Sequence, residues 1–168
     1  MTALLDRALK LATPVLTYRT VSLRIPLRTC PDGALDLGFA TVRSAALAKN
    51  LGDASELVIL AATVGLGIDR LIARYGESAP SVALMLDAIG SERIEALVDA
   101  FSAALAQTHT LRPRFSPGYG DLPLALQADI FRVLDCPRPI GLSLNESLLM
   151  TPSKSVTALI GLTPTKQE

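Results

Sequence analysis

Hydrophobic residues follow two different spacings along the chain, which predicts that helices and strands are both present. Leucine and alanine recur at helical spacing over residues 4–11 and stop at Pro14, which predicts a short amphipathic N-terminal helix. The same spacing extends over residues 81–107, so we predict a long helix in which Gly90 is a weak point. Shorter helices are predicted at residues 45–49, 68–75 and 124–134.

Five segments have the composition or the alternation of strands. Residues 15–25 are rich in β-forming side chains, and Asp32-Gly33 is typical of a turn into a second short strand at residues 35–39. Residues 56–64 are almost continuously apolar, which predicts a central strand buried on both faces. Further strands are predicted at residues 140–144 and 155–162, with Pro137 and Pro139 ending the helix before them. This order predicts an α+β fold, a single domain with a mostly antiparallel, twisted sheet flanked by helices.

Composition argues against several classes of protein. A chain of 168 residues is long enough for one domain with its own core, and 49% hydrophobic residues exclude a disordered chain. The longest apolar runs are shorter than the roughly 20 residues of a membrane-spanning helix, so we expect no membrane span. Lysine plus arginine and aspartate plus glutamate both total 16, which leaves no net charge to attract nucleic acid.

The cysteines and the histidine argue against a metal centre. Cys30 and Cys136 are far apart and form no C-x-x-C pair, and His109 is the one histidine, so no four-ligand zinc site is expected. Asp6 is an acidic residue in the N-terminal stretch that would be basic in a signal peptide, so we expect no signal peptide. We therefore expect a cytoplasmic protein with two free thiols.

Charges are distributed unevenly along the chain. Residues 1–50 carry 7 basic and 3 acidic groups, and residues 51–100 carry 3 basic and 8 acidic groups. We interpret this as a basic strand region and an acidic helical face rather than a docking site. Most acidic residues of the long helix are therefore expected to be solvated; they are Asp87, Glu92, Glu95 and Asp99.

Two patterns approach known motifs without completing them. Gly65-Leu66-Gly67 follows a strand and opens a helix, but the third glycine of a G-x-G-x-x-G fingerprint would fall at Arg70, so we predict tight strand-to-helix packing instead of nucleotide binding. His109 has no nucleophile elbow beside it, so we predict no catalytic residue. A hydrolase that uses His109 stays open as an alternative.

The strongest candidate for a binding segment reads RPRFSPGYGD from Arg112 onward. Its two prolines fix the backbone, and its two glycines permit left-handed conformations, so the segment cannot be regular structure. The guanidinium of Arg114 matches a carboxylate or phosphate, while Phe115 and Tyr119 offer flat faces for a ring. The segment therefore predicts a ligand with an anionic part and an aromatic part.

The order of motifs in the second half of the chain resembles a known family. Arg114 is followed by the Gly118-Tyr119 pair, the 124–134 helix, residues 140–147 (IGLSLNES), Met150, Pro152 and Ser155-Val156. Residues 112–162 thus resemble the activation domain of vitamin B12-dependent methionine synthase, the module that binds S-adenosylmethionine. Residues 58–101 are similar to the strand, glycine turn and helix pair of that family. On this resemblance the single domain, 1–168, comprises an N-terminal helix and hairpin region at 1–55 and a family-matching core at 56–168.

The resemblance implies specific roles for a few residues. The arginine and the tyrosine of the family motif contact S-adenosylmethionine, and an acid of the preceding long helix helps to hold it; by position these are Arg114, Tyr119 and Asp99. Further candidate contacts are Phe115, Ser116, Gly118 and Glu146, of which Glu146 is equally suited to a solvated strand end.

The resemblance also implies a partner. It implies a protein that assists the reductive remethylation of cobalamin in a separate methionine synthase. The cobalamin would come from the corrinoid-binding domain of that truncated enzyme. Methyl transfer from a sulfonium requires no general acid or base, which agrees with the lack of a catalytic dyad.

One departure from the family favours an alternative function. The fused enzyme has an aromatic-rich strand near the end of the domain, where this sequence has Leu159-Ile160-Gly161-Leu162. The alternative is a non-catalytic docking module for a corrinoid protein, which keeps the fold without binding S-adenosylmethionine.

Overall fold

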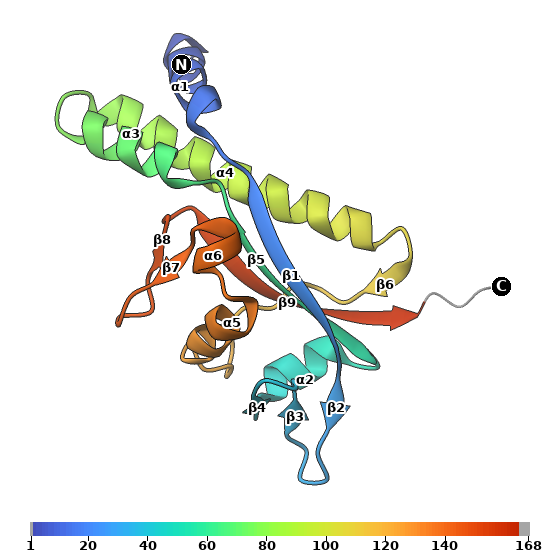
Figure 1. The fold of residues 1–168 in the computed structure, drawn as a ribbon. Helices are drawn as coiled ribbons and strands as arrows, with labels where there is room; N and C mark the ends of the chain where they lie inside the picture. Colours follow the sequence, from blue (N-terminus) through green and yellow to red (C-terminus); the bar gives the residue numbers. More distant parts are fainter. Residues whose placement is uncertain (1, 165–168) are drawn as a thin grey trace.

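An antiparallel sheet of four strands organises the fold, which a computed structural model describes for residues 2–164 (Figure 1). Its spatial order is β1 (Arg19–Pro26), β5 (Glu56–Thr63), β9 (Ser155–Pro164) and β6 (His109–Leu111). All eight residues of β5 pair with both β1 and β9, and seven of the eight are buried. The prediction of a central strand buried on both faces is confirmed.

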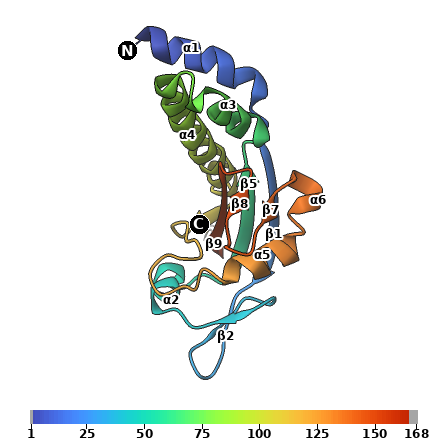
Figure 2. The same cartoon turned by 90° about the vertical axis from the view of Figure 1, so that its left-hand side faces the viewer.

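The two faces of β5 contribute to two large hydrophobic cores, and Val58 belongs to a third, smaller cluster with Ile160 and Leu162. Leu60 and Ala62 join one core, which α1 (Thr2–Ala12), α3 (Leu66–Gly76) and α4 (Pro80–Leu105) complete on one side of the sheet (Figure 2). Ile59 and Ala61 join the other core, with α2 (Ala45–Leu51), α5 (Leu126–Leu134) and α6 (Pro137–Ile140). The predicted α+β architecture, with helices flanking a mostly antiparallel sheet, is confirmed.

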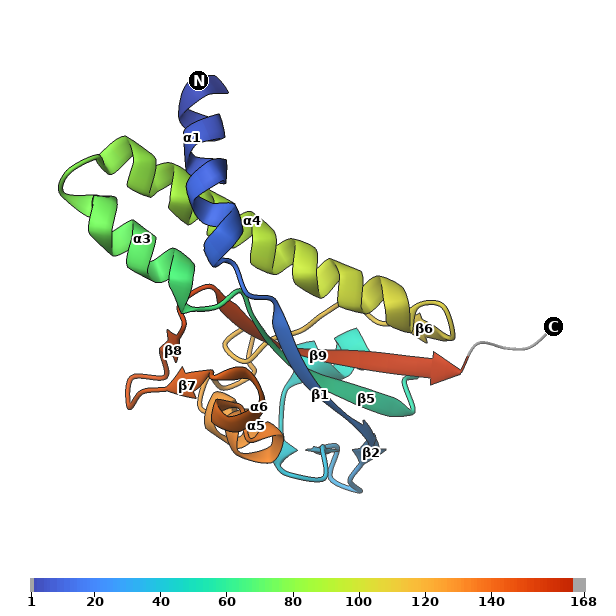
Figure 3. The ribbon, with the colours of Figure 1, turned by 45° about the horizontal axis from the view of Figure 1, so that its top comes forward.

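Short elements surround this framework (Figure 3). They are the 3-10 helix η1 (Thr13–Val15), the three-stranded sheet of β2 (Arg28–Thr29), β3 (Leu35–Asp36) and β4 (Thr41–Val42), and the hairpin of β7 (Ser143–Leu144) and β8 (Met150–Thr151). The predicted turn at Asp32-Gly33 therefore connects β2 to β3 rather than the long strand to its neighbour.

Several boundaries differ from the sequence-based expectation. The strand predicted at 35–39 is reduced to Leu35–Asp36. The strand predicted from residue 15 begins at Arg19, because Thr13–Val15 form a 3-10 helix and residues 16–18 are irregular. The strand predicted at 140–144 is reduced to Ser143–Leu144. α5 ends at Leu134 as predicted, and Pro137 then opens the additional short helix α6, since proline is well tolerated in the first turn of a helix, where its missing N–H is not needed.

Glycines mark close contacts between elements. A Cβ on Gly67 would lie 2.4 Å from the Val15 carbonyl oxygen, and one on Gly65 would lie 2.1 Å from Thr17 Oγ1, so this turn is tightly packed, although against η1 and the segment before β1 rather than against a strand. Gly90 does not break α4. A Cβ there would lie 2.9 Å from Lys154 Cγ, so this glycine admits a side chain from another element rather than weakening the helix.

Residues 2–164 contain no helix that is long and apolar enough to cross a membrane. Within the same residues no three histidine, cysteine or acidic side chains are grouped so that they could hold a metal ion. Both thiols are free, and burial raises the pKa of Cys136 to about 11.

A candidate ligand pocket beside Arg114

The segment that contains the RPRFSPGYGD motif continues the sheet beyond β6 as an irregular edge along β9. Arg112 N donates to Gly161 O at 2.9 Å, and Phe115 and Leu159 exchange two backbone hydrogen bonds of 3.0 and 2.7 Å. The Ser116 hydroxyl adds a bond of 2.7 Å to Thr157 O. These bonds fix the backbone on both sides of Arg114 against a central part of the fold.

The chain then turns sharply between Ser116 and Leu122. Gly118 and Gly120 have φ of 92° and 54°, so both adopt the left-handed backbone that the motif predicts. A Cβ on Gly120 would lie only 2.7 Å from the Cβ of Ala46 at the start of α2. The turn is therefore pressed against α2.

Asp121 fastens this turn to the N-terminus of α2. Its carboxylate accepts hydrogen bonds from the Ser44 hydroxyl and from the backbone N–H groups of Ala45 and Ala46, the last two at 2.7 and 3.1 Å. These hydrogen bonds lower the pKa of Asp121; the bond from Ser44 has the largest effect and the bond from Ala45 N–H the next largest. Asp121 thus acts as a structural anchor of the segment.

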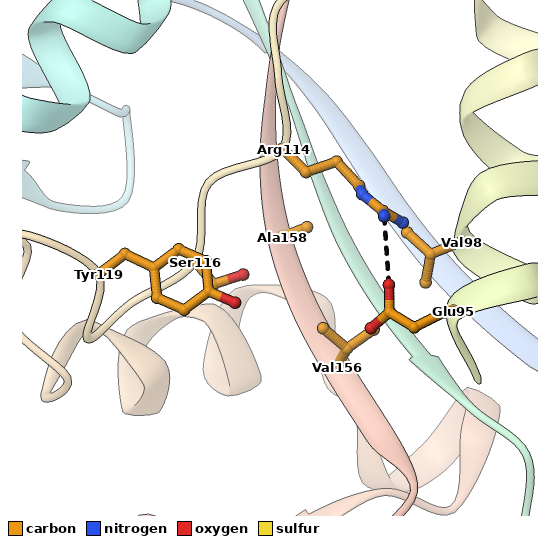
Figure 4. A pocket seen from close by; sticks show the side chains of 7 residues that line it. All are labelled: Glu95, Val98, Arg114, Ser116, Tyr119, Val156 and Ala158. Carbon is orange, nitrogen blue, oxygen red and sulfur yellow. Dashed lines mark hydrogen bonds and ion pairs between the residues drawn. The ribbon is translucent and has the colours of Figure 1, made fainter. Parts of the chain in front are cut away.

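A cavity of about 220 Å³ lies between this segment, β9 and α4 (Figure 4). It is lined by Glu95, Val98, Arg114, Ser116, Tyr119, Val156 and Ala158. Arg114 extends from the segment toward α4, while Val98, Val156 and Ala158 form the aliphatic part of the wall (Figure 4). The cavity combines two charged groups, those of Arg114 and Glu95, with apolar side chains, and a few polar groups in an apolar wall are the usual composition of a small-molecule site.

Arg114 forms ion pairs with two carboxylates of α4. Its Nη2 lies 3.0 Å from Asp99 Oδ1 and 3.2 Å from Glu95 Oε2. The two acids are four residues apart and so share one face of the helix. The side chain of Arg114 is 31% exposed, and those of Glu95 and Asp99 are 62% and 70% exposed, so solvent reaches all three groups.

Tyr119 is the one aromatic residue in the wall of the cavity. Its side chain is 60% exposed, and its ring meets the Phe115 ring edge-on with 6.0 Å between centroids. Phe115 itself packs against the core beneath the sheet and does not line the cavity. The Tyr119 ring is therefore largely exposed to solvent while it keeps an edge contact with Phe115.

The structure brings together most, but not all, of the predicted site residues. Arg114, Ser116 and Tyr119 line one cavity, Asp99 pairs with Arg114, and Gly118 shapes the turn between them. Glu146 lies elsewhere, in the turn between β7 and β8, where it lines a separate open groove with Phe131 and Leu148.

Sequence reasoning overlooked Glu95, which was expected to be one of the solvated acids of the long helix. Its spacing of four residues from Asp99 is the signal that could have identified it. Asp87 pairs with Lys154 Nζ at 2.7 Å, so it too has a partner although it remains half-exposed.

Arg112 and His109 lie outside the cavity. Arg112 pairs with Asp53 and packs on Gly52 and Gly161. His109 is in β6, with Nδ1 2.7 Å from Thr108 Oγ1. Neither residue is among those that line the pocket around Arg114.

No protein-family model and no curated protein sequence match the chain. Among solved structures, it is similar to a crystal structure of the MetH reactivation domain bound to AdoHcy, with a TM-score of 0.59 and 17% sequence identity. The match covers 99% of this chain and 66% of that chain, so this chain spans slightly less than two thirds of its structural neighbour. At this identity the likeness shows the fold, an activation-domain-like α+β domain.

Proposed function

We propose that this chain is an activation-domain-like protein that binds S-adenosylmethionine beside Arg114 and assists the reductive remethylation of cobalamin in a separate methionine synthase. The observation that carries the proposal is the pairing of Arg114 with both Asp99 and Glu95 at the wall of one cavity. The fold likeness to a reactivation domain bound to AdoHcy supports it.

These three charges suit the amino-acid end of the ligand. An arginine fork binds a carboxylate through two parallel hydrogen bonds, and a carboxylate of α4 accepts hydrogen bonds from an ammonium group. A bound α-amino acid would therefore insert between Arg114 and the acids, so that each ion pair is replaced by one with the ligand. No charge loses its partner in this exchange.

Net charge distinguishes S-adenosylmethionine from its product. Arg114, Glu95 and Asp99 together carry one surplus negative charge. The amino-acid end of the ligand is a neutral zwitterion, and the sulfonium of S-adenosylmethionine adds the positive charge that balances the surplus. S-adenosylhomocysteine has an uncharged thioether, so the site is expected to bind it less tightly.

The adenosine is expected to extend out of the cavity. Ligand pockets usually enclose about 300–1,000 Å³, whereas the cavity here holds about 220 Å³. The amino-acid end would fill it, and the exposed ring of Tyr119 lies at its mouth for the adenine to stack on. S-adenosylmethionine supplies a methyl group that is already activated, so the tasks of this chain are to orient the ligand and to exclude water with Val98, Val156 and Ala158.

The aliphatic wall favours a second candidate function. Tyr119 is the one aromatic residue among those lining the cavity, and Leu159, Ile160 and Leu162 of β9 are fully buried, so they cannot add a face for adenine. The alternative is a docking module for a corrinoid protein that uses this surface without S-adenosylmethionine.

Two experiments separate the candidates. Equilibrium dialysis of the wild-type chain with labelled S-adenosylmethionine tests ligand binding. Retention of the wild-type chain on an immobilised cobalamin-binding domain tests the partner. Ligand binding with retention supports the leading proposal. Retention without ligand binding supports the docking module, and failure of both contradicts the two functions together.

A further inference from the structure

β1 has the longest unpaired strand edge in residues 2–164. Its eight residues pair with β5 in unbroken register on one side. On the other side no backbone hydrogen bond joins Arg19–Pro26 to another part of residues 2–164. β1 lies along the front of the sheet in Figures 1 and 3, with no element drawn over it.

Flanking hydrogen bonds show which groups of β1 point outward. Val64 N donates to Lys154 O at 3.1 Å, so the even-numbered residues of β5 bond to β9 and the odd-numbered ones bond to β1. Leu27 N donates to Ser55 O at 3.0 Å, which agrees that the odd-numbered residues on the β1 side bond inward. The N–H and C=O groups of Thr20, Ser22 and Arg24 therefore face away from the sheet, and all three residues are exposed.

We propose that a second copy of this chain pairs with this edge, antiparallel and centred on Ser22, so that two sheets join into one. Residues directly opposite each other in a continuous sheet point to the same face. Ser22 then lies opposite Ser22 of the second copy, and Thr20 lies opposite Arg24. Each copy donates three backbone N–H groups and accepts three.

Side chains favour a second copy in this register. On the face shared with α5 and α6, Val21 lies opposite Leu23 and Arg19 lies opposite Ile25, so no two like charges are directly opposed. The side chain of Arg24 remains paired with Glu56 of its own copy. Pro26, which has no N–H to donate, lies outside the six new bonds.

Edge strands that stay unpaired usually carry a device that prevents association. Such devices include bulges, charged side chains and proline on the edge strand. β1 carries Arg19, Arg24 and, as its last residue, Pro26, but Arg24 is paired with Glu56 and the register with β5 is unbroken. The ligand pocket lies near the opposite edge, beside β9 and α4, so pairing through β1 leaves it open and does not depend on the proposed function.

Sedimentation equilibrium tests this association. The wild type is expected to be a dimer whose dissociation constant rises at least about tenfold in Ser22→Lys, which brings two ammonium groups together on the axis. Ser22→Pro removes an N–H group that points away from the sheet, so it is expected to raise the dissociation constant of the dimer as well. Its circular dichroism spectrum should match that of the wild type, because no hydrogen bond within one copy is lost. A monomeric wild type, or a dimer of equal affinity in Ser22→Lys, overturns the proposal.

Cross-linking tests the register. In a Cys30→Ser background, Ser22→Cys is expected to form an intermolecular disulfide on mild oxidation. Thr20→Cys is the matched control, because its opposite residue is Arg24 and no second cysteine is in reach. Equal cross-linking of the two variants contradicts a pairing centred on Ser22.

Discussion

The Ser44 hydroxyl donates a hydrogen bond to the carboxylate of Asp121, 77 residues further along the chain. Ser44 is also the N-cap of α2, where its Oγ accepts a bond of 3.0 Å from Leu47 N. The Ser44 side chain therefore both caps the N-terminus of α2 and holds the segment that carries Arg114 and Tyr119. The positions of these two side chains depend on a part of the chain that never touches the cavity.

Replacing Asp121 with asparagine is expected to lower the melting temperature at neutral pH. The variant loses the charge that accepts from Ser44 and the α2 N–H groups. Because folding lowers the pKa of Asp121, its contribution is present above the ordinary aspartate value of about 3.9 and is lost as the pH falls through the folded value. The difference in melting temperature between wild type and variant should therefore shrink below pH about 4.

Asp6→Asn is the matched control, since Asp6 lies on an exposed face of α1. It should melt within about a degree of the wild type, as surface substitutions usually do. A difference between wild type and Asp121→Asn that stays constant down to pH about 2 would show that the charge of Asp121 is not involved.

Thr157→Val is expected to reduce the free energy of unfolding by about 1–3 kcal/mol, measured by urea denaturation. Thr157 is 2% exposed, and its hydroxyl donates to Gln127 Oε1 at 2.7 Å. Valine keeps the shape but leaves the buried amide oxygen without this donor. Thr110→Val, on the exposed edge strand β6, should reduce the free energy of unfolding far less. Equal reductions in the two variants would argue that the hydrogen bond between Thr157 and Gln127 does not stabilise the fold.

Gly67→Ala is expected to destabilise the fold by about 1–3 kcal/mol, because the new methyl group would collide with the Val15 carbonyl. Gly76→Ala is the matched control on the same helix. No atom lies within 4 Å of a Cβ there, so its stability should be equal to or above that of the wild type. A Gly67→Ala variant as stable as Gly76→Ala would contradict the tight contact between α3 and η1.

The spacing of hydrophobic residues predicted the elements that are buried evenly along their length. β5 is buried on both faces and α4 along one stripe, so their sequences carry the pattern directly. The strand expected at 140–144 begins only at Ser143, because a short apolar run does not distinguish a strand from a buried helix end, and Ile140 belongs to α6.

The candidate site was predictable only where it is local in sequence. The motif from Arg112 to Asp121 identified the segment, since prolines and glycines specify irregular backbone. Glu95 was not identified because its partner, Arg114, is 19 residues away and both side chains are partly solvated. The anchoring role of Asp121 likewise depends on a contact with Ser44 that only the fold reveals.

Glu95→Gln is expected to weaken the binding of S-adenosylmethionine roughly two- to fivefold and to change the affinity for S-adenosylhomocysteine less, as measured by competition. The variant removes the surplus negative charge that balances the sulfonium. The expected change is small because the Glu95 side chain is 62% exposed. Glu92→Gln, on the same helix but outside the cavity, should bind both ligands as the wild type does. Equal losses for the two ligands would contradict the charge argument.

Calorimetric titration of S-adenosylmethionine into the wild type, Arg114→Ala and Arg112→Ala tests the central claim most directly. Both arginines belong to the same segment and pair with acids, but only Arg114 lines the cavity. We predict binding by the wild type and by Arg112→Ala, and a dissociation constant about 10- to 100-fold higher for Arg114→Ala. No heat of binding in the wild type, or equal affinity in the Arg114→Ala variant, would contradict the account.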